Sequence, residues 1–130
     1  MDIIKNNSNG VANTFIYELH ENDNFDIKLF TLLVLAVAEL SESVKENFIL
    51  KIEILEYINN ITTYTYSSII WSNLEKKIIK NITNNTELTY SVVAILTTVE
   101  RSFILGFNST EQIKKLFLEL NSSENKENTK

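Results

Sequence analysis

The sequence has no cysteine and no proline, and only two glycines, Gly10 and Gly106, in 130 residues. The lack of cysteine excludes disulfides, thiolate zinc sites and cysteine nucleophiles. Two isolated glycines exclude the glycine-rich loops that bind phosphates in Walker and Rossmann motifs. A single histidine, His20, excludes a metal site built from several histidines. The chain therefore lacks the residues on which most common catalytic motifs depend.

The length and the composition predict one soluble domain. Hydrophobic residues make up 44% of the chain, which is enough for one core at this length. The first ten residues contain no apolar stretch typical of a secretory signal. The most apolar segment, from Leu29 to Leu40, is shorter than the roughly 20 residues that a membrane span needs. We therefore expect a cytoplasmic protein with no membrane partner.

The scarcity of glycine and proline, together with apolar residues spaced by three and four, predicts an all-α fold. We expect a single-domain bundle of about six helices, with disordered polar termini. Residues 1–10 are expected to be a flexible N-terminus, 11–120 the helical domain and 121–130 a disordered tail. The predicted helices cover residues 11–20, 25–40, 44–59, 67–82, 86–105 and 110–120.

Several local signals set these boundaries. Ser43 and Glu46 match a capping box, as do Ser109 and Gln112, and Gly106 stands where a left-handed residue ends a helix. The helix over 25–40 is apolar around most of its circumference, which predicts either the buried central helix or an extra apolar face for a partner. The helix over 44–59 is expected to bury one stripe, Val44, Phe48, Ile52, Leu55 and Ile58.

The segment from 61 to 72 is ambiguous. Residues 61–66 (ITTYTY) favour a strand by propensity, but a strand would need a pairing partner, so we interpret them as a loop entering the next helix. A strand over 61–72, and another over 89–99, remains the alternative. Trp71 has helical spacing and is expected in the core, whereas Tyr64 and Tyr66 are expected to be exposed.

Candidate catalytic groups are few, and each has a simpler explanation. His20 is followed by Glu21 but by no second histidine, so it is interpreted as a surface residue at a helix end. Asp23 and Asp26 lack the glycine and the glutamate of a calcium loop and are interpreted as helix caps. We therefore expect no enzyme activity, no metal and no cofactor.

Two short groups of lysines, Lys76, Lys77 and Lys80 and then Lys114 and Lys115, are the only basic strips. Nucleic-acid-binding proteins usually carry a basic balance and several arginines, whereas this chain has one arginine and a net charge of −5. These lysines are therefore interpreted as solvated helix faces. A nucleic-acid partner is expected only under the alternative hypothesis given below.

The acidic residues are concentrated in one half of the chain. Residues 1–65 carry ten acids and four lysines, whereas residues 66–130 carry seven acids and eight basic residues. A surface of one sign steers an oppositely charged partner and speeds its association. Exposed tyrosines are frequent anchors in protein interfaces. The residues predicted to bind a partner are Glu18, Glu21, Asp23, Asp26, Glu39, Glu42, Glu46, Glu53, Glu56, Tyr64 and Tyr66.

These features favour a non-catalytic inhibitor of the immunity or antitoxin type. Such a protein would neutralise a cognate basic toxin, such as a nuclease, by covering its active site. One alternative is a nucleic-acid-associated regulator that uses helix 67–82 or 110–120. Another is a viral helical decoy that binds a host peptide helix on the surplus apolar face between Leu32 and Val37.

Overall fold

The computed structural model describes residues 1–75 and 77–128, without the side chains of residue 75 and residues 121–128. Within this part the chain forms six α-helices and no strand, which confirms the predicted all-α bundle. The helices are α1 (Asp2–Ser8), α2 (Phe15–Glu21), α3 (Ile27–Ser43), α4 (Phe48–Glu75), α5 (Thr86–Leu105) and α6 (Thr110–Asn128).

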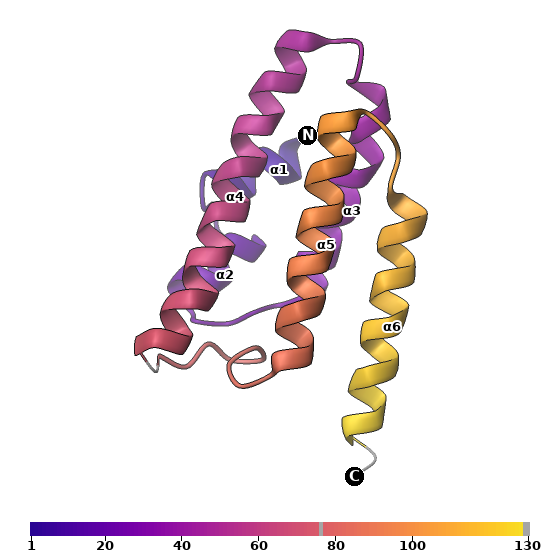
Figure 1. Cartoon of the computed structure of the whole chain (residues 1–130). Helices are drawn as coiled ribbons and strands as arrows, with labels where there is room; N and C mark the ends of the chain where they lie inside the picture. The colour runs from indigo at the N-terminus through magenta and orange to yellow at the C-terminus, as the bar shows by residue number, and fades with distance from the viewer. Residues whose placement is uncertain (76, 129–130) are drawn as a thin grey trace.

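The long helices α4, α5 and α6 lie side by side, with α3 behind α5 and the short α1 and α2 behind α4 (Figure 1). Helix α3 packs against α5, α6, α1 and α2, whereas α4 packs against α1, α2 and α5. The prediction of a buried central helix over 25–40 is thus confirmed for α3. The exception is Leu32, which is 56% exposed on its outer side.

Four phenylalanines form the centre of the core at one end of α3. The ring centroid of Phe30 lies 5.2 Å from those of Phe15 and Phe25 and 6.1 Å from that of Phe117. The rings of Phe15 and Phe25 meet edge to face at 5.1 Å. Tilted and edge-to-face pairs at these distances add stabilisation beyond the apolar area that they bury. This cluster joins α2, α3 and α6.

The apolar stripes predicted for the last two helices are confirmed. In α6, Leu116 is partly buried and the other members of its stripe are buried, Ile113, Phe117 and Leu120. The stripe of α5 is buried throughout, and its members are Leu88, Val92, Ile95, Leu96, Val99 and Phe103. Helix α5 begins at Thr86 and α6 at Thr110, as predicted. The Asn85 side chain caps α5. At the start of α6 the Asn108 side chain, rather than the Ser109 hydroxyl of the predicted capping box, accepts a hydrogen bond from the Thr110 N–H. The Ser109 hydroxyl instead accepts one from Ser102, at 2.7 Å.

Helix α5 also has the length and composition of a membrane span, which the sequence interpretation did not recognise. The mean hydropathy of its most apolar 18-residue stretch is 1.4, and 39% of that stretch is buried inside the protein. The core helix of a soluble protein meets the same two criteria, and α5 packs against α3, α4 and α6. The buried stripe of α5 is therefore accounted for by the bundle itself.

The prediction of two helices separated by a loop at 61–66 is wrong, because α4 runs as one helix of 28 residues. Burial of Ile61, Thr62 and Thr65 against the bundle overrides their preference for strands. The Thr65 hydroxyl donates to the Ile61 carbonyl at 2.8 Å, so its hydrogen bond is satisfied within the helix.

The start of α4 also differs from the prediction. Ser43 is the last residue of α3, and the Asn47 side chain accepts the Leu50 N–H at 3.1 Å where α4 begins. The buried face therefore shifts around the helix. Phe48 and Ile52, which were expected in the core, are 73% and 50% exposed.

The end of α4 differs as well, because the helix stops at Glu75 rather than continuing to 82. The following segment turns back, and the Lys80 N–H donates to the Asp23 carbonyl at 2.7 Å while the Lys80 carbonyl accepts from Phe25 at 3.0 Å. Trp71 lies on the outside of α4 and is 56% exposed, so its expected place in the core is wrong.

The expected loose N-terminus is contradicted, whereas the expected disordered tail falls on residues that are only partly described. The N-terminus is not loose, because residues 2–8 form α1 and bury Ile4 and Asn7 in the bundle. At the other end, the backbone of α6 continues as helix to Asn128. The predicted disordered tail, 121–130, falls on residues whose side chains, and for 129–130 whose backbone also, lie outside the described part.

Gly106 ends α5 in the left-handed conformation, with φ of 79°, as its position in the sequence predicted. A Cβ atom at this position would lie 2.8 Å from the Cβ of Lys45. Gly10 has a similar φ of 64°, but a Cβ there would meet nothing within 4 Å. An alanine at Gly10 would therefore introduce backbone strain alone, whereas an alanine at Gly106 would introduce the same strain and a steric overlap.

Gly106→Ala is expected to destabilise the protein by about 2 kcal/mol or more, because it adds a clash to the roughly 1 kcal/mol of left-handed strain. Gly10→Ala is expected to cost only that strain. Thermal unfolding followed by circular dichroism measures both variants. Equal losses in the two variants would mean that Lys45 moves aside freely.

Candidate functional site

The structure divides the predicted partner-binding residues into two groups of acids and two tyrosines. One acidic group surrounds the connection between α2 and α3, and the other lies on the hairpin formed by the end of α3 and the start of α4. Helix α3 runs the length of the bundle between them, so the groups lie at opposite ends of the molecule (Figure 1). The nine acids therefore do not form one continuous surface.

The acids of the first group are engaged within the chain. Glu18 accepts a hydrogen bond from the Asn22 side chain at 3.1 Å. Asp26 caps α3 by accepting from the Lys28 and Leu29 N–H groups, as the sequence predicted.

The other two acids of this group each lie against a basic side chain. Asp23 lies 3.1 Å from the Lys77 ammonium, and Glu21 lies 3.0 Å from the His20 Nδ1. Because all four carboxylates have partners, this end has less charge to offer to another protein.

The acids of the second group face solvent. All five are exposed, and they are Glu39, Glu42, Glu46, Glu53 and Glu56. We call them the hairpin acids. Within the described part of the chain only Glu53 has a side-chain partner, the Tyr57 hydroxyl at 3.2 Å. Partial desolvation and this hydrogen bond to a carboxylate raise the pKa of Tyr57.

Two lysines accompany the hairpin acids, and neither forms an ion pair with them in the described structure. The Lys51 ammonium donates to the Ile104 carbonyl at 2.7 Å, which ties the start of α4 to the end of α5. Lys45 packs its side chain over Gly106. The hairpin therefore presents a net negative surface.

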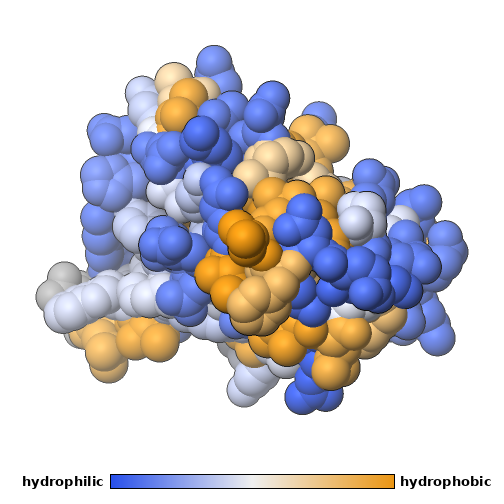
Figure 2. All heavy atoms as spheres, turned by 90° about the horizontal axis from the view of Figure 1, so that it is seen from above, coloured by the Kyte–Doolittle hydropathy of each residue, from blue (hydrophilic) through white to orange (hydrophobic). Residues whose placement is uncertain are grey.

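Apolar side chains lie next to the hairpin acids. Phe48 and Ile49 begin α4, and Ile104 and Leu105 end α5 beside them, all of them at least half exposed. Seen from this end, apolar residues gather in the middle of the face and hydrophilic residues surround them (Figure 2). An apolar centre with a charged rim has the anatomy of a protein interface. The spacing of Phe48 suggested a core residue, so the sequence did not reveal this patch.

The sequence predicted that Tyr64 and Tyr66 would lie in an exposed loop. They are instead half-buried on α4. They face different neighbours. Tyr66 approaches the Thr97 hydroxyl at 3.5 Å and lines a hollow of about 510 Å³ between α4 and α5. The Tyr64 ring lies 5.8 Å from the His20 ring, on the side of α1 and α2. The structure therefore does not bring the two tyrosines into one contact surface.

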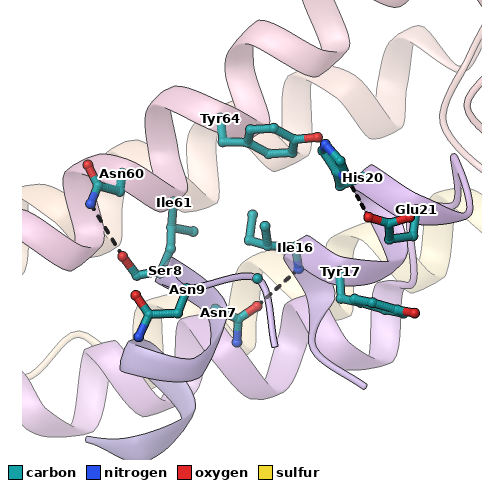
Figure 3. Close-up of a pocket in the computed structure, with 11 residues that line it drawn as sticks. Asn7, Ser8, Asn9, Ile16, Tyr17, His20, Glu21, Asn60, Ile61 and Tyr64 are labelled. Atoms are coloured by element: carbon teal, nitrogen blue, oxygen red, sulfur yellow. Dashed lines mark hydrogen bonds and ion pairs between the residues drawn. The ribbon is translucent and has the colours of Figure 1, made fainter. Parts of the chain in front are cut away.

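A cavity of about 440 Å³ opens between α1, α2 and α4, and most of the residues that line it are polar. Tyr64, His20 and Glu21 line one end and Asn60 and Ser8 the other (Figure 3). Burial raises the pKa of Tyr64, and the charges of Asp23 and Glu21 raise it further, against Ser68 and Lys77.

The polar groups of this cavity have structural partners. Asn60 donates to the Ser8 hydroxyl at 3.3 Å, and Asn7 accepts the Ile16 N–H at 3.1 Å and donates to the Ile3 carbonyl at 2.8 Å. His20 is 61% exposed and pairs only with Glu21. The His20–Glu21 pair is therefore open to water at the edge of the cavity.

The described residues contain no cluster of three or more His, Cys, Asp or Glu side chains that could hold a metal ion. The alternative recognition element over 67–82 is divided, because α4 ends at Glu75 and the segment after it turns back. The surplus apolar face between Leu32 and Val37 is reduced to one strongly exposed residue, Leu32. Comparisons of the chain with protein-family models, with curated proteins and with solved structures found no match.

Proposed function

We propose that this protein is a non-catalytic inhibitor of the immunity or antitoxin type, which binds a basic protein partner with the hairpin end of the bundle. The observation that carries the proposal is the set of five exposed hairpin acids around the apolar residues Phe48 and Ile49. We propose a cognate toxin, such as a nuclease, as the partner and occlusion of its active site as the mechanism.

The charge of the hairpin suits such a target. A nuclease must attract a polyanion, so its active face carries a positive potential. Exposed carboxylates on a rigid hairpin reproduce the negative charge of that substrate, and they speed the encounter with a basic surface. Among the described residues, only Glu53 of the hairpin acids has a side-chain partner. Binding through the other four carboxylates would therefore break no internal contact.

The apolar residues next to the hairpin acids are expected to slow dissociation of the partner. Rim charges mainly change the association rate, whereas buried apolar and aromatic anchors slow dissociation. Phe48 is 73% exposed and Ile49 is 82% exposed, and both lie on a helix rather than on a mobile loop. A partner that covered them would gain apolar burial at little cost in ordering the chain.

The proposal is tested by co-expression with the products of the neighbouring genes, followed by affinity capture at low salt. We expect a basic protein to be retained, and its toxic or nuclease activity to be lost in the complex. The double variant Glu42→Lys/Glu46→Lys is expected to slow association about tenfold or more. Surface plasmon resonance at two salt concentrations measures that rate.

The matched control is Glu111→Lys/Glu119→Lys, which makes the same change of charge at exposed positions of α6. It is expected to leave the rate within about threefold of the original, because only the long-range field changes. Equal effects of the two double variants would contradict binding through the hairpin. Capture of no basic protein from the native host would contradict the proposed function itself.

A further inference from the structure

The outer face of α4 carries apolar side chains at both of its ends. At the start of the helix Phe48, Ile49 and Ile52 are 73%, 82% and 50% exposed. Near the end Ile70, Trp71 and Leu74 are 56%, 56% and 74% exposed. Monomeric proteins seldom expose such groups without a function.

The two groups lie on the same side of the helix. Exposed positions of α4 recur at intervals of three and four residues along most of its length, and one stripe consists of Ile49, Ile52, Glu56, Asn59, Thr63, Ile70 and Leu74. This spacing places side chains on one face of a helix. The stripe is apolar at its two ends and polar in its middle third. It does not face α1, α2 or α5, because all its members are exposed.

The two ends of this stripe differ in the sign of the charge around them. Glu42, Glu46 and Glu53 accompany the first end, against Lys45 and Lys51. In the sequence, Lys76, Lys77 and Lys80 follow the second end, against Glu75, and Asp23 lies beside Lys77. The Lys77 ammonium forms an ion pair with Asp23 at 3.1 Å, but its side chain is still 58% exposed to solvent.

We propose that the outer face of α4 binds the same face of a second copy of this chain, with the two helices antiparallel. Such a pairing places the acidic, apolar start of each helix on the basic, apolar end of the other. A two-fold axis at the level of residue 61 brings Ile52 opposite Ile70 and Asn59 opposite Thr63, and it brings Ile49 to within one residue of Leu74. Each apolar group then meets an apolar group, and the polar middle meets itself.

A second copy fits this face better than other occupants do. A basic partner would match only the start of α4, and an anionic lipid surface only its end. In a two-fold dimer both ends of each α4 stripe are covered by the partner. The same surface is used on both copies, so no further copy can add to it. The helix of 28 residues is about 42 Å long at 1.5 Å per residue, so the contact is extended.

The inference does not depend on the inhibitor role, because it concerns only this chain. Ile49 and Glu56 belong to both surfaces, so the dimer would compete with a basic partner. Self-association is measured on the purified chain alone. A failure here therefore leaves the proposed function untouched, and the reverse also holds.

Sedimentation equilibrium of the full chain over a range of concentrations tests the proposal. We expect a monomer–dimer equilibrium that weakens in high salt. Ile49→Lys puts a positive charge against the basic end of the partner helix, and Leu74→Glu puts a negative charge against its acidic start. Each single variant is expected to raise the dimer dissociation constant about tenfold or more.

The double variant Ile49→Lys/Leu74→Glu separates antiparallel from parallel pairing. In the antiparallel dimer the two new charges face each other and attract, so the dissociation constant should return to within about threefold of the original. In a parallel dimer each new charge would face its own copy, and dimerisation would be weakened further. Leu118→Glu is the control, because Leu118 is 69% exposed on α6 and should not change dimerisation.

Three results would overturn the proposal. The first is a wild-type chain that stays monomeric at roughly 1 mM. The second is a double variant that dimerises no better than the single variants. The third is a loss of dimer in Leu118→Glu equal to that in Leu74→Glu, which would assign the contact to another face.

Discussion

Phe30→Ala is expected to lower the free energy of unfolding by about 3–5 kcal/mol. Phe30 is completely buried, and its ring lies 5.2 Å from the rings of both Phe15 and Phe25. Truncation removes the aromatic contacts and leaves a cavity where α2, α3 and α6 meet. Neighbouring side chains cannot fill it, because they belong to different helices. Equilibrium unfolding in urea, followed by far-ultraviolet circular dichroism, measures the loss.

A conservative variant keeps this prediction testable if the alanine variant does not fold. Phe30→Leu retains most of the volume and is expected to cost only about 1–1.5 kcal/mol. The control is Phe48→Ala at low protein concentration, with an expected change within about 0.5 kcal/mol. Phe48 is 73% exposed, although its spacing in the sequence predicted burial. Equal losses at the two positions would contradict the register of α4 in the structure.

The sequence correctly predicted the buried residues of those helices that bury only one face. In α5 the stripe that includes Val92, Ile95 and Val99 is buried as expected, because one side of the helix packs against α3, α4 and α6 and the other faces solvent. Such a helix has a clear apolar period, and the period alone places its core residues. Helix α6 was predicted for the same reason.

Most of α4 was predicted to be helical, but its continuity and its buried face were not, because its apolar residues are distributed all round it. Ile54 and Ile58 face the bundle, whereas Ile49 and Ile52 face solvent. No single stripe therefore marks the buried side, and a choice of register by periodicity alone is ambiguous. The informative signal was a negative one, since the sequence from 47 to 85 contains no glycine or proline to interrupt a helix.

The candidate site was predicted only in part for a related reason. Charge counts along the sequence placed the acidic residues in the first half of the chain, and the hairpin acids are indeed exposed. The capping pattern identified Asp26 as engaged at the start of α3, but nothing in the sequence shows that Asp23 pairs with Lys77. Whether a carboxylate is available to a partner depends on tertiary contacts, and no local pattern records them.

The N-terminal helix α1 gives the second large effect. Ile4→Ala is expected to lower the free energy of unfolding by about 2–4 kcal/mol. Ile4 is completely buried, and α1 packs against α2, α3 and α4. The sequence predicted a loose segment here, because two isoleucines among polar residues give no period. The buried Asn7 anchors α1 through the Ile16 N–H, nine residues away.

Two measurements distinguish a docked helix from a loose segment. Val11→Ala is the control for the unfolding free energy, because Val11 is 44% exposed and should change it by no more than about 0.5 kcal/mol. Hydrogen exchange at the Ile16 amide is the second measurement. Ile4→Ala should speed that exchange well before the core of α5 opens, because loosening α1 withdraws the Asn7 acceptor. If the first ten residues were loose, neither the unfolding free energy nor the exchange rate would respond to Ile4→Ala.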